Sequence, residues 1–266
     1  MKSASQENPA RGKVLLIGWD SADWEMIDPL MESGCMPALA RLVKNGMRGN
    51  LATLQPVLSP MLWTSIATGK RADRHGICGF TEPLADGTGI GPVRSTSRKC
   101  KAIWNIFTQA GLKTNVIGWF ASHPAEPING VMLTENFLRY GPGKASNTPL
   151  SPGTVHPPGL AAEAAEWQVP TESLTPEDLV PFVPRLAEID LNKDDRPLKL
   201  ARRLSRAASV QAAATALIHT QPWDLMCVYF DAIDQFAHEF MPYHPPRMPD
   251  VSERDFELYS GVMAGC

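Results

Sequence analysis

Short apolar runs alternate with longer amphipathic segments along most of this chain. Lys13–Trp19 (KVLLIGW) and Leu225–Phe230 (LMCVYF) are short and bounded by polar residues, which is typical of buried parallel strands. Met36–Asn45 has apolar residues at helical spacing and is followed by Gly46, so it predicts a helix. The same criteria predict further strands at Met47–Leu54, Thr114–Trp119 and Val131–Thr134, and helices within Ser21–Gly34 and at Pro60–Thr68, Lys101–Ala110 and Leu198–His219.

This alternation indicates an α/β fold with a doubly wound, mostly parallel sheet. Residues 140–197 differ, because Pro, Gly, Ser and acidic residues dominate there and only Leu160–Trp167 suggests a weak helix. We interpret this segment as a cap inserted over the sheet. The predicted organisation is a disordered polar tail (1–12), the N-terminal part of the α/β domain (13–139), the cap (140–197) and a return to the domain (198–266) that is incomplete at its C-terminal end.

The overall composition excludes several classes of protein. The chain has 266 residues and a net charge of −3, so bulk charge indicates neither nucleic-acid binding nor attachment to an anionic membrane. No stretch approaches the roughly 18 apolar residues of a membrane span, and the polar first twelve residues are unlike a signal peptide. Five scattered cysteines without a Cys-x-x-Cys pair favour a reduced, cytoplasmic protein.

The stretch that follows the last predicted strand carries the most informative side chains. Asp231, Asp234 and His238 come directly after Leu225–Phe230, at the edge where open α/β sheets bind ligands. Asp234 and His238 are four residues apart, so one helical turn places them on the same face. A carboxylate with an imidazole suits zinc or a similar divalent ion. The alternative is a helix-capping aspartate followed by a surface histidine.

Two further residues occupy positions suited to chemistry. Asp20 follows the first predicted strand, and it is free for another role if Ser21 or Asp23 caps the next helix; the alternative is that Asp20 is the cap. Ser59 precedes Pro60, which makes it a natural N-cap. The same position would place its hydroxyl at a helix N-terminus that favours a phosphate, where a metal could turn it into a nucleophile.

These residues, in this order, lie in segments that resemble a known group of enzymes. The segments read VLLIGWDSADW, CMPALARLVKNGMRG, LSPMLWTSIATGKRADRHGI and VYFDAIDQFAH, and together they reach from about Lys13 to Phe240. They resemble the alkaline phosphatase superfamily, and within it the type I phosphodiesterase/nucleotide pyrophosphatase branch. The resemblance implies a doubly wound sheet with helices on both faces, and hydrolysis of a small phosphoric ester.

The resemblance also implies a role for each residue. Members hold two divalent metal ions, usually zinc; by analogy, Asp20 and Ser59 belong to one ion, and Asp234 and His238 to the other. Ser59 corresponds to the family's Thr or Ser nucleophile, which attacks phosphorus and forms a phosphoseryl intermediate that water then hydrolyses. Asp231 is expected to support a ligand or cap the turn, and His75 to be structural.

Departures from the family pattern limit these expectations. Phe80 stands where nucleotide pyrophosphatases have a phosphate-binding Asn, so a nucleotide substrate is not supported, and Cys35–Leu39 lacks the Arg of a sulfatase motif. The family's later Asp-His-Gly and a further His are absent, which leaves both metal shells incomplete. We expect a fragment of a longer gene product, with a natural short form as the alternative. A phosphotransferase and an inactive ligand-binding protein are the alternative functions, and the sequence leaves the oligomeric state open.

Overall fold

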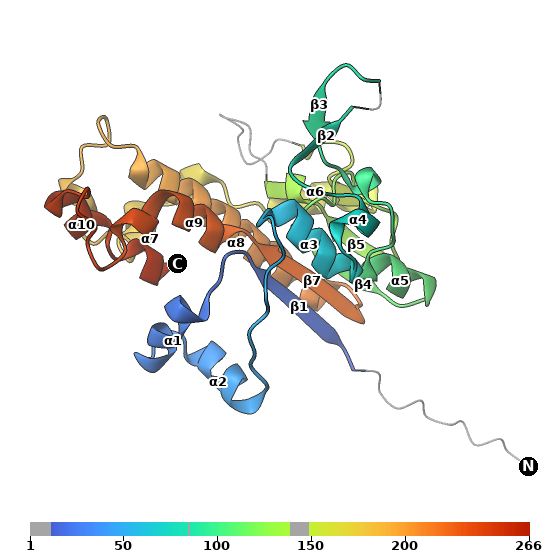
Figure 1. Cartoon of the computed structure of the whole chain (residues 1–266), viewed down its shortest axis with the longest axis horizontal. Coiled ribbons are helices and arrows are strands. Elements are labelled where there is room, and N and C mark those ends of the chain that lie inside the picture. The colour runs from blue at the N-terminus through green and yellow to red at the C-terminus, as the bar shows by residue number, and fades with distance from the viewer. Residues whose placement is uncertain (1–11, 85, 139–148) are drawn as a thin grey trace, which may run out of the picture.

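The computed structural model describes residues 12–84, 86–138 and 149–266, so the predicted tail lies almost entirely outside the described residues. A five-stranded sheet forms the centre of the fold (Figure 1). Its order is β1 (Val14–Trp19), β7 (Leu225–Phe230), β4 (Thr114–Ile117), β5 (Gly130–Leu133) and β6 (Val155–His156). The first four strands are parallel and β6 is antiparallel to β5. The predicted α/β class with a mostly parallel sheet is therefore confirmed.

Helices cover both faces of the sheet, and alternate residues of each strand explain how. In β4, Ile117 joins a core with α6 (Ala161–Glu166) and α8 (Arg196–Thr220), whereas Val116 faces α3 (Ser59–Thr68) and α5 (Ile103–Gln109). β7 divides in the same way between the two cores, because successive side chains of a strand point to opposite faces. The helical layers predicted by the resemblance are thus present.

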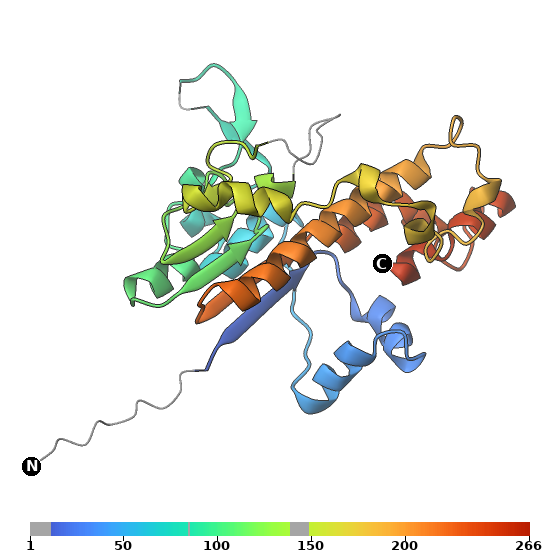
Figure 2. The same ribbon diagram turned by 180° about the vertical axis from the view of Figure 1, so that it is seen from behind.

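The remaining elements lie around this centre. Helices α9 (Ala232–Phe240), α10 (Glu253–Tyr259) and α11 (Val262–Gly265) pack with one end of α8 in a separate apolar cluster (Figure 2). Helices α1 (Trp24–Glu32) and α2 (Pro37–Asn45) lie apart from the sheet, and α2 buries no residue (Figure 1). The other short elements are α4 (Ala72–His75), α7 (Pro176–Leu179), the hairpin β2 (Thr81–Pro83) and β3 (Ile90–Pro92), and 3-10 turns at Ser95–Ser97, Glu135–Leu138, Pro158–Leu160, Thr171–Ser173, Leu186–Glu188 and Met241–Tyr243.

Strand β1 forms one edge of the sheet and is poorly covered. It pairs only with β7 among the described strands, and Val14, Leu15 and Ile17 are about half exposed. The strand predicted at Met47–Leu54 is wrong: this segment is coil, with Met47 and Leu51 fully or nearly fully exposed. Its apolar composition suggested a strand, but a strand needs a neighbour for its backbone hydrogen bonds, and this segment pairs with none in the described structure.

The segment predicted as a cap is described from residue 149 onward. It begins at the sheet, because β6 pairs with β5, and then continues into α6 and the short α7. Helix α6 confirms the weak helix within Leu160–Trp167. The proposed domain boundaries stay predictions. Among the described helices, none has the length and apolar character needed to cross a membrane, and all five cysteines carry free thiols.

Candidate functional site

Asp20 and Asp231 emerge together at the carboxyl edge of the sheet. Strands β1 and β7 are parallel neighbours, with Trp19 beside Phe230, and the backbone N–H of Asp20 donates to the Phe230 carbonyl at 3.0 Å. Parallel strands present their carboxyl ends at one edge, where open α/β sheets bind ligands. The fold therefore brings together two segments that lie more than two hundred residues apart, as their positions after predicted strands indicated.

The carboxylate of Asp20 is buried and engaged by a tyrosine. Only 8% of Asp20 is exposed, and its Oδ2 accepts a hydrogen bond from the Tyr229 hydroxyl at 2.7 Å. Asp23, not Asp20, caps α1, because its carboxylate accepts from the backbone N–H of Glu25 at 2.7 Å. The alternative that Asp20 is a helix cap is therefore wrong, and its carboxylate is positioned instead within the edge of the sheet.

Asp234 and His238 share one face of α9, as their spacing predicted. His238 Nε2 lies 3.6 Å from Asp234 Oδ2, and the histidine side chain is 75% exposed whereas that of Asp234 is 21% exposed. The other oxygen of Asp234 accepts from the Ser21 hydroxyl at 2.9 Å. Ser21 has φ +63°, a left-handed conformation that non-glycine residues adopt at a cost. A strained turn thus joins Asp234 to the loop that carries Asp20.

Asp231 has a supporting position. It stands at the N-cap of α9, but its side chain makes no capping hydrogen bond. Its carboxylate forms an ion pair with Arg206, which extends from α8. Arg206 also donates to the Leu138 carbonyl at 3.2 Å. Asp231 therefore fixes the start of α9 to the long helix, rather than bonding either Asp234 or His238.

Ser59 lies in the first turn of α3, and its hydroxyl has no hydrogen-bond partner among the described residues. The helix begins at Ser59 and its N-cap is Leu58, so the prediction that Ser59 itself is the cap is wrong. Within the described residues the hydroxyl makes no hydrogen bond, and the residue is partly exposed. The side chain of the N-cap residue Leu58 cannot accept a hydrogen bond, so the N–H groups of Ser59 and Met61 in the first turn have no side-chain cap, and Pro60 has no N–H. The position thus offers a nucleophilic oxygen together with helix N–H donors.

Trp63 ties α3 to the strands that carry the aspartates. Its ring contacts Tyr229 at a centroid distance of 4.7 Å, and a Cβ built on Gly18 of β1 would come within 2.4 Å of it. Gly18 is therefore required for the close approach of helix and strand. Trp63 is one helical turn after Ser59, and Tyr229 donates to Asp20. The start of α3 accordingly belongs to the same edge of the sheet as Asp20.

The electrostatic environment at this edge is negative. Burial raises the pKa of Tyr229, and the nearby carboxylates of Asp20, Asp231 and Asp234 raise it further. A tyrosinate at this position would be desolvated and repelled by these negative charges. Tyr229 is therefore a permanent hydrogen-bond donor to Asp20 in the working pH range, and the edge favours a cation over an anion in the absence of other charges.

Residues 14–255 match the pattern of the family described as Type I phosphodiesterase / nucleotide pyrophosphatase. The chain belongs to this family. A search of the curated proteins finds no match. The resemblance expected from the motifs is confirmed over most of the described chain, and with it membership of a family of phosphoester hydrolases.

Solved structures show the same fold. Phosphonoacetate hydrolase from Sinorhizobium meliloti 1021, in complex with phosphonoformate, matches with a TM-score of 0.52 and 16% identity over 96% of this chain and 53% of that chain. Murine ectonucleotide pyrophosphatase / phosphodiesterase 5 matches with a TM-score of 0.51 and 15% identity over 95% and 50%. This family member spans about half the length of these structures.

The donors in the described part of this phosphodiesterase-family chain do not fit a complete metal site. No cluster of three or more His, Cys, Asp or Glu side chains suited to a metal ion occurs among the described residues. Asp234 and His238 supply one oxygen and one nitrogen, and Asp20 is bonded to Tyr229. Zinc sites ordinarily take three or four protein donors. The described residues thus provide parts of a coordination shell.

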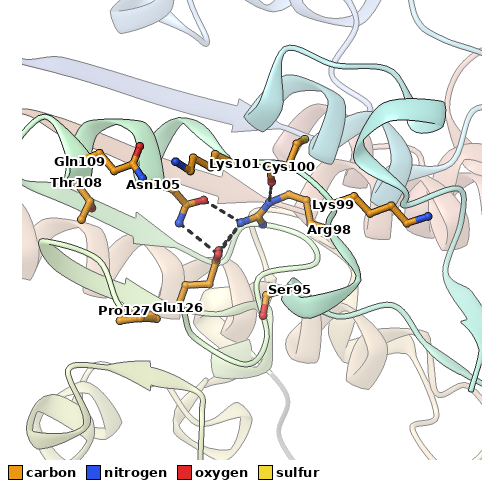
Figure 3. Close-up of a pocket in the computed structure, with 10 residues that line it drawn as sticks. All are labelled: Ser95, Arg98, Lys99, Cys100, Lys101, Asn105, Thr108, Gln109, Glu126 and Pro127. Atoms are coloured by element: carbon orange, nitrogen blue, oxygen red, sulfur yellow. Dashed lines mark hydrogen bonds and ion pairs between the residues drawn. The ribbon is translucent and has the colours of Figure 1, made fainter. Parts of the chain in front are cut away.

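A separate pocket lies along α5 and uses none of the predicted site residues. Figure 3 shows the Arg98 guanidinium next to Asn105 and Glu126. Arg98 Nη2 donates to both carboxylate oxygens of Glu126, at 2.6 and 2.7 Å. Trp104 Nε1 also donates to Glu126 at 2.9 Å. The polar side chains at the centre of this pocket therefore form hydrogen bonds with one another. The pocket is lined by Ser95, Arg98, Lys99, Cys100, Lys101, Asn105, Thr108, Gln109, Glu126 and Pro127.

Sequence reasoning missed Glu135, a partly buried carboxylate just beyond β5. Its Oε2 accepts from the backbone N–H of Ser122 at 2.9 Å and from the Ser122 hydroxyl at 2.8 Å. Burial raises the pKa of Glu135, although the hydrogen bonds from Ser122 oppose this shift. Glu135 directly follows the predicted strand Val131–Thr134, and this position was the feature of the sequence that could have indicated it. Glu135 fixes the turn after β4, at the same edge of the sheet.

His75 is fully buried and has a structural role. Its Nδ1 accepts a hydrogen bond from the backbone N–H of Ile77, and its Nε2 donates to the Ser65 hydroxyl at 2.9 Å.

The raised pKa of Glu135 predicts a pH dependence of stability. The unfolded chain loses this proton at lower pH than the folded chain, so ionisation opposes folding as pH rises from the unfolded pKa through the folded pKa. We expect the free energy of unfolding of Glu135→Gln to increase relative to that of wild type as the pH rises above about 4.3, the ordinary pKa of a glutamate in an unfolded chain. Urea unfolding at each pH measures the difference, and Glu163→Gln, on the exposed surface of α6, is the control. An identical pH dependence of wild type and Glu135→Gln would contradict the prediction.

Proposed function

We propose that this protein hydrolyses small phosphoric esters through nucleophilic attack by Ser59. The observation that carries the proposal is the Ser59 hydroxyl, which is unbonded within the described residues and lies at the N-terminal turn of α3. That turn belongs to the edge of the sheet that carries Asp20 and Asp234. Helix N–H groups bind phosphate oxygens and orient phosphorus toward a hydroxyl at the same helix start.

The reaction has two steps in this proposal. The Ser59 oxygen forms a bond to phosphorus while the bond to the ester oxygen breaks, and the departing alcohol takes up the proton that the serine loses. Water then attacks the phosphoserine, releases phosphate and restores the hydroxyl. The N–H groups of Ser59 and Met61 in the first turn of α3 hold the phosphoryl oxygens in both steps, because the same negative charge is present throughout.

Dependence on two divalent ions, with zinc preferred, is also part of the proposal. Its support is the family and the donor chemistry of Asp234 and His238, with Asp20 as a further carboxylate. A bound divalent ion supplies charge neutralisation for phosphoryl oxygens. The donors of the described residues fall short of a full coordination shell for either ion. A cytoplasmic location and the absence of nucleic-acid and membrane partners stay predictions.

The phosphoseryl intermediate provides the direct test. The full gene product that contains these residues would be freed of metal, incubated with p-nitrophenyl phosphate or its diester with and without zinc, and quenched in acid. We expect zinc-dependent release of p-nitrophenol and a phosphoryl group on the peptide that contains Ser59, detected by mass spectrometry. Turnover with an unmodified Ser59 peptide throughout the time course, or no turnover, would contradict the proposal. Glycerol added as an acceptor separates hydrolysis from phosphotransfer.

A further inference from the structure

A line of aromatic rings leads from Asp20 to the protein surface. Tyr229 donates to Asp20, and its ring lies 6.4 Å from that of Phe120, in an edge-to-face arrangement. Phe120 in turn meets Phe80 edge-to-face at 5.9 Å. Phe120 is partly buried in the turn after β4, whereas Phe80, just before β2, is 52% exposed. Phe80 and Phe120 therefore form an apolar wall that begins beside the buried aspartate and ends in solvent.

The loop that carries Phe80 also lies close to the start of α3. The loop that carries Phe80 packs against the residue before the nucleophile, since a Cβ on Gly79 would lie 3.5 Å from Leu58 Cδ1. Leu58 is the N-cap of α3, and Ser59 follows it. The position of Phe80 is thus fixed from two directions: by Gly79 against Leu58, and by Phe120 against Tyr229. One line of contact ends at the residue before Ser59, and the other ends at the tyrosine that donates to Asp20.

The turn that carries Phe120 has a strained backbone and is held in place by hydrogen bonds to Glu135. Ala121 has φ +56° and is 2% exposed, and it is one of two non-glycine residues with positive φ among those described; the other is Ser21 in the site. Glu135 holds the next residue, Ser122, through its N–H and its hydroxyl. Strained residues persist where the surroundings over-determine them, and they occur often at ligand sites. The hydrogen bonds between Ser122 and Glu135 therefore keep the Phe120 ring in contact with Phe80.

We propose that Phe80 and Phe120 form an apolar subsite beside Ser59 that takes an aryl or alkyl group of the phosphoester substrate. The proposal rests on the proposed function, because it assigns the substrate class of that site. Aromatic walls bind apolar groups through the area that they remove from water, and the edge-to-face pair exposes ring surface for this contact. The substrate class is accordingly a phosphoester with a hydrophobic substituent.

The test compares two non-hydrolysable ligands that share a headgroup. Phenylphosphonate and methylphosphonate would be titrated into the full gene product with zinc present, and their dissociation constants measured by calorimetry. We expect phenylphosphonate to bind about tenfold more tightly, and Phe80→Ser to bring the two constants within about twofold of each other. Ile106→Ser is the control, because Ile106 on α5 has the same 52% exposure as Phe80; it should keep the preference. Equal binding by wild type, or a preference that survives in Phe80→Ser, would overturn the subsite.

A second measurement removes the need for the phosphoryl group. Saturation-transfer NMR with phenol should show contact with the wild-type protein, and this signal should fall in Phe80→Ser and persist in Ile106→Ser. An equal phenol signal in wild type and Phe80→Ser would overturn the subsite. A different result would contradict the proposed function. If the Ser59 peptide stays unmodified during turnover, Ser59 is not the nucleophile, and the preference for the phenyl group can still be measured. If wild type forms the phosphoserine at Ser59 but binds phenylphosphonate and methylphosphonate equally, the subsite alone is contradicted.

Discussion

Ser59→Ala is expected to lower kcat for aryl phosphoester hydrolysis by at least about a thousandfold, because it removes the only group that forms the bond to phosphorus. The free energy of unfolding should stay within about 0.5 kcal/mol of wild type, since the hydroxyl makes no hydrogen bond within the described residues. The measurement is steady-state turnover of p-nitrophenyl phosphate by the full gene product, with urea unfolding of the same preparations.

Ser65→Ala on the same helix is the matched control, and it should show the reverse behaviour. The Ser65 hydroxyl donates to the Met61 carbonyl at 2.8 Å and accepts from the fully buried His75. Its removal leaves a buried donor unsatisfied, which costs about 1–3 kcal/mol, while the Ser59 position is unchanged. If Ser59→Ala kept more than a tenth of wild-type turnover, or if both variants lost activity and stability together, Ser59 would not be the nucleophile.

Glu126→Ala is expected to lower the free energy of unfolding by about 3–5 kcal/mol, because it leaves the Arg98 guanidinium buried without its counter-charge. The Arg98 side chain is 5% exposed and forms two hydrogen bonds to this carboxylate, at 2.6 and 2.7 Å. Glu126 also accepts from Trp104, a residue of the core between the sheet and α5. Urea unfolding would measure the loss, provided that the m-value, the slope of the free energy of unfolding against urea concentration, is the same in the variant and wild type.

Two further variants show whether the buried charge is the cause. Arg98→Met combined with Glu126→Leu removes both charges, and it should recover much of the stability that Glu126→Ala loses. Arg185→Ala breaks an exposed pair with Glu188 and Glu257, and it should have a far smaller effect. A double variant as unstable as Glu126→Ala would show that lost packing, rather than an unpaired charge, accounts for the change.

The sequence predicted the elements that depend on local patterns. Both site strands, β1 and β7, lie within a residue of their predicted bounds, because a short apolar run between polar residues indicates a buried strand whatever its neighbours are. Helix α3 ends at Thr68 and its C-cap, Gly69, has φ +63°, so the predicted glycine stop also has a local cause. From these strands alone, Asp20 and Asp231 could be placed at one edge of the sheet.

The parts that sequence reasoning missed depend on contacts between distant segments. Whether Met47–Leu54 forms a strand depends on a partner strand, which composition does not reveal. The bond from Ser21 to Asp234 joins residues 213 positions apart, and the role of Glu135 depends on its bonds to Ser122. The cap of α3 was predicted at Ser59, one residue too late, because Ser and Pro together are common at helix starts but do not fix where the helical backbone begins.

The uncovered edge of the sheet has a consequence for the behaviour of the protein in solution. Strand β1 reads VLLIGW, with no charge and no proline, and its outer backbone groups and half-exposed apolar side chains resemble the segments that nucleate fibrils. Such an edge is a template for strands from any molecule in the same state. Association through this edge is therefore expected to limit the concentration at which this polypeptide stays monomeric, and Ile17→Lys, which places a charge on the edge, is expected to raise that concentration.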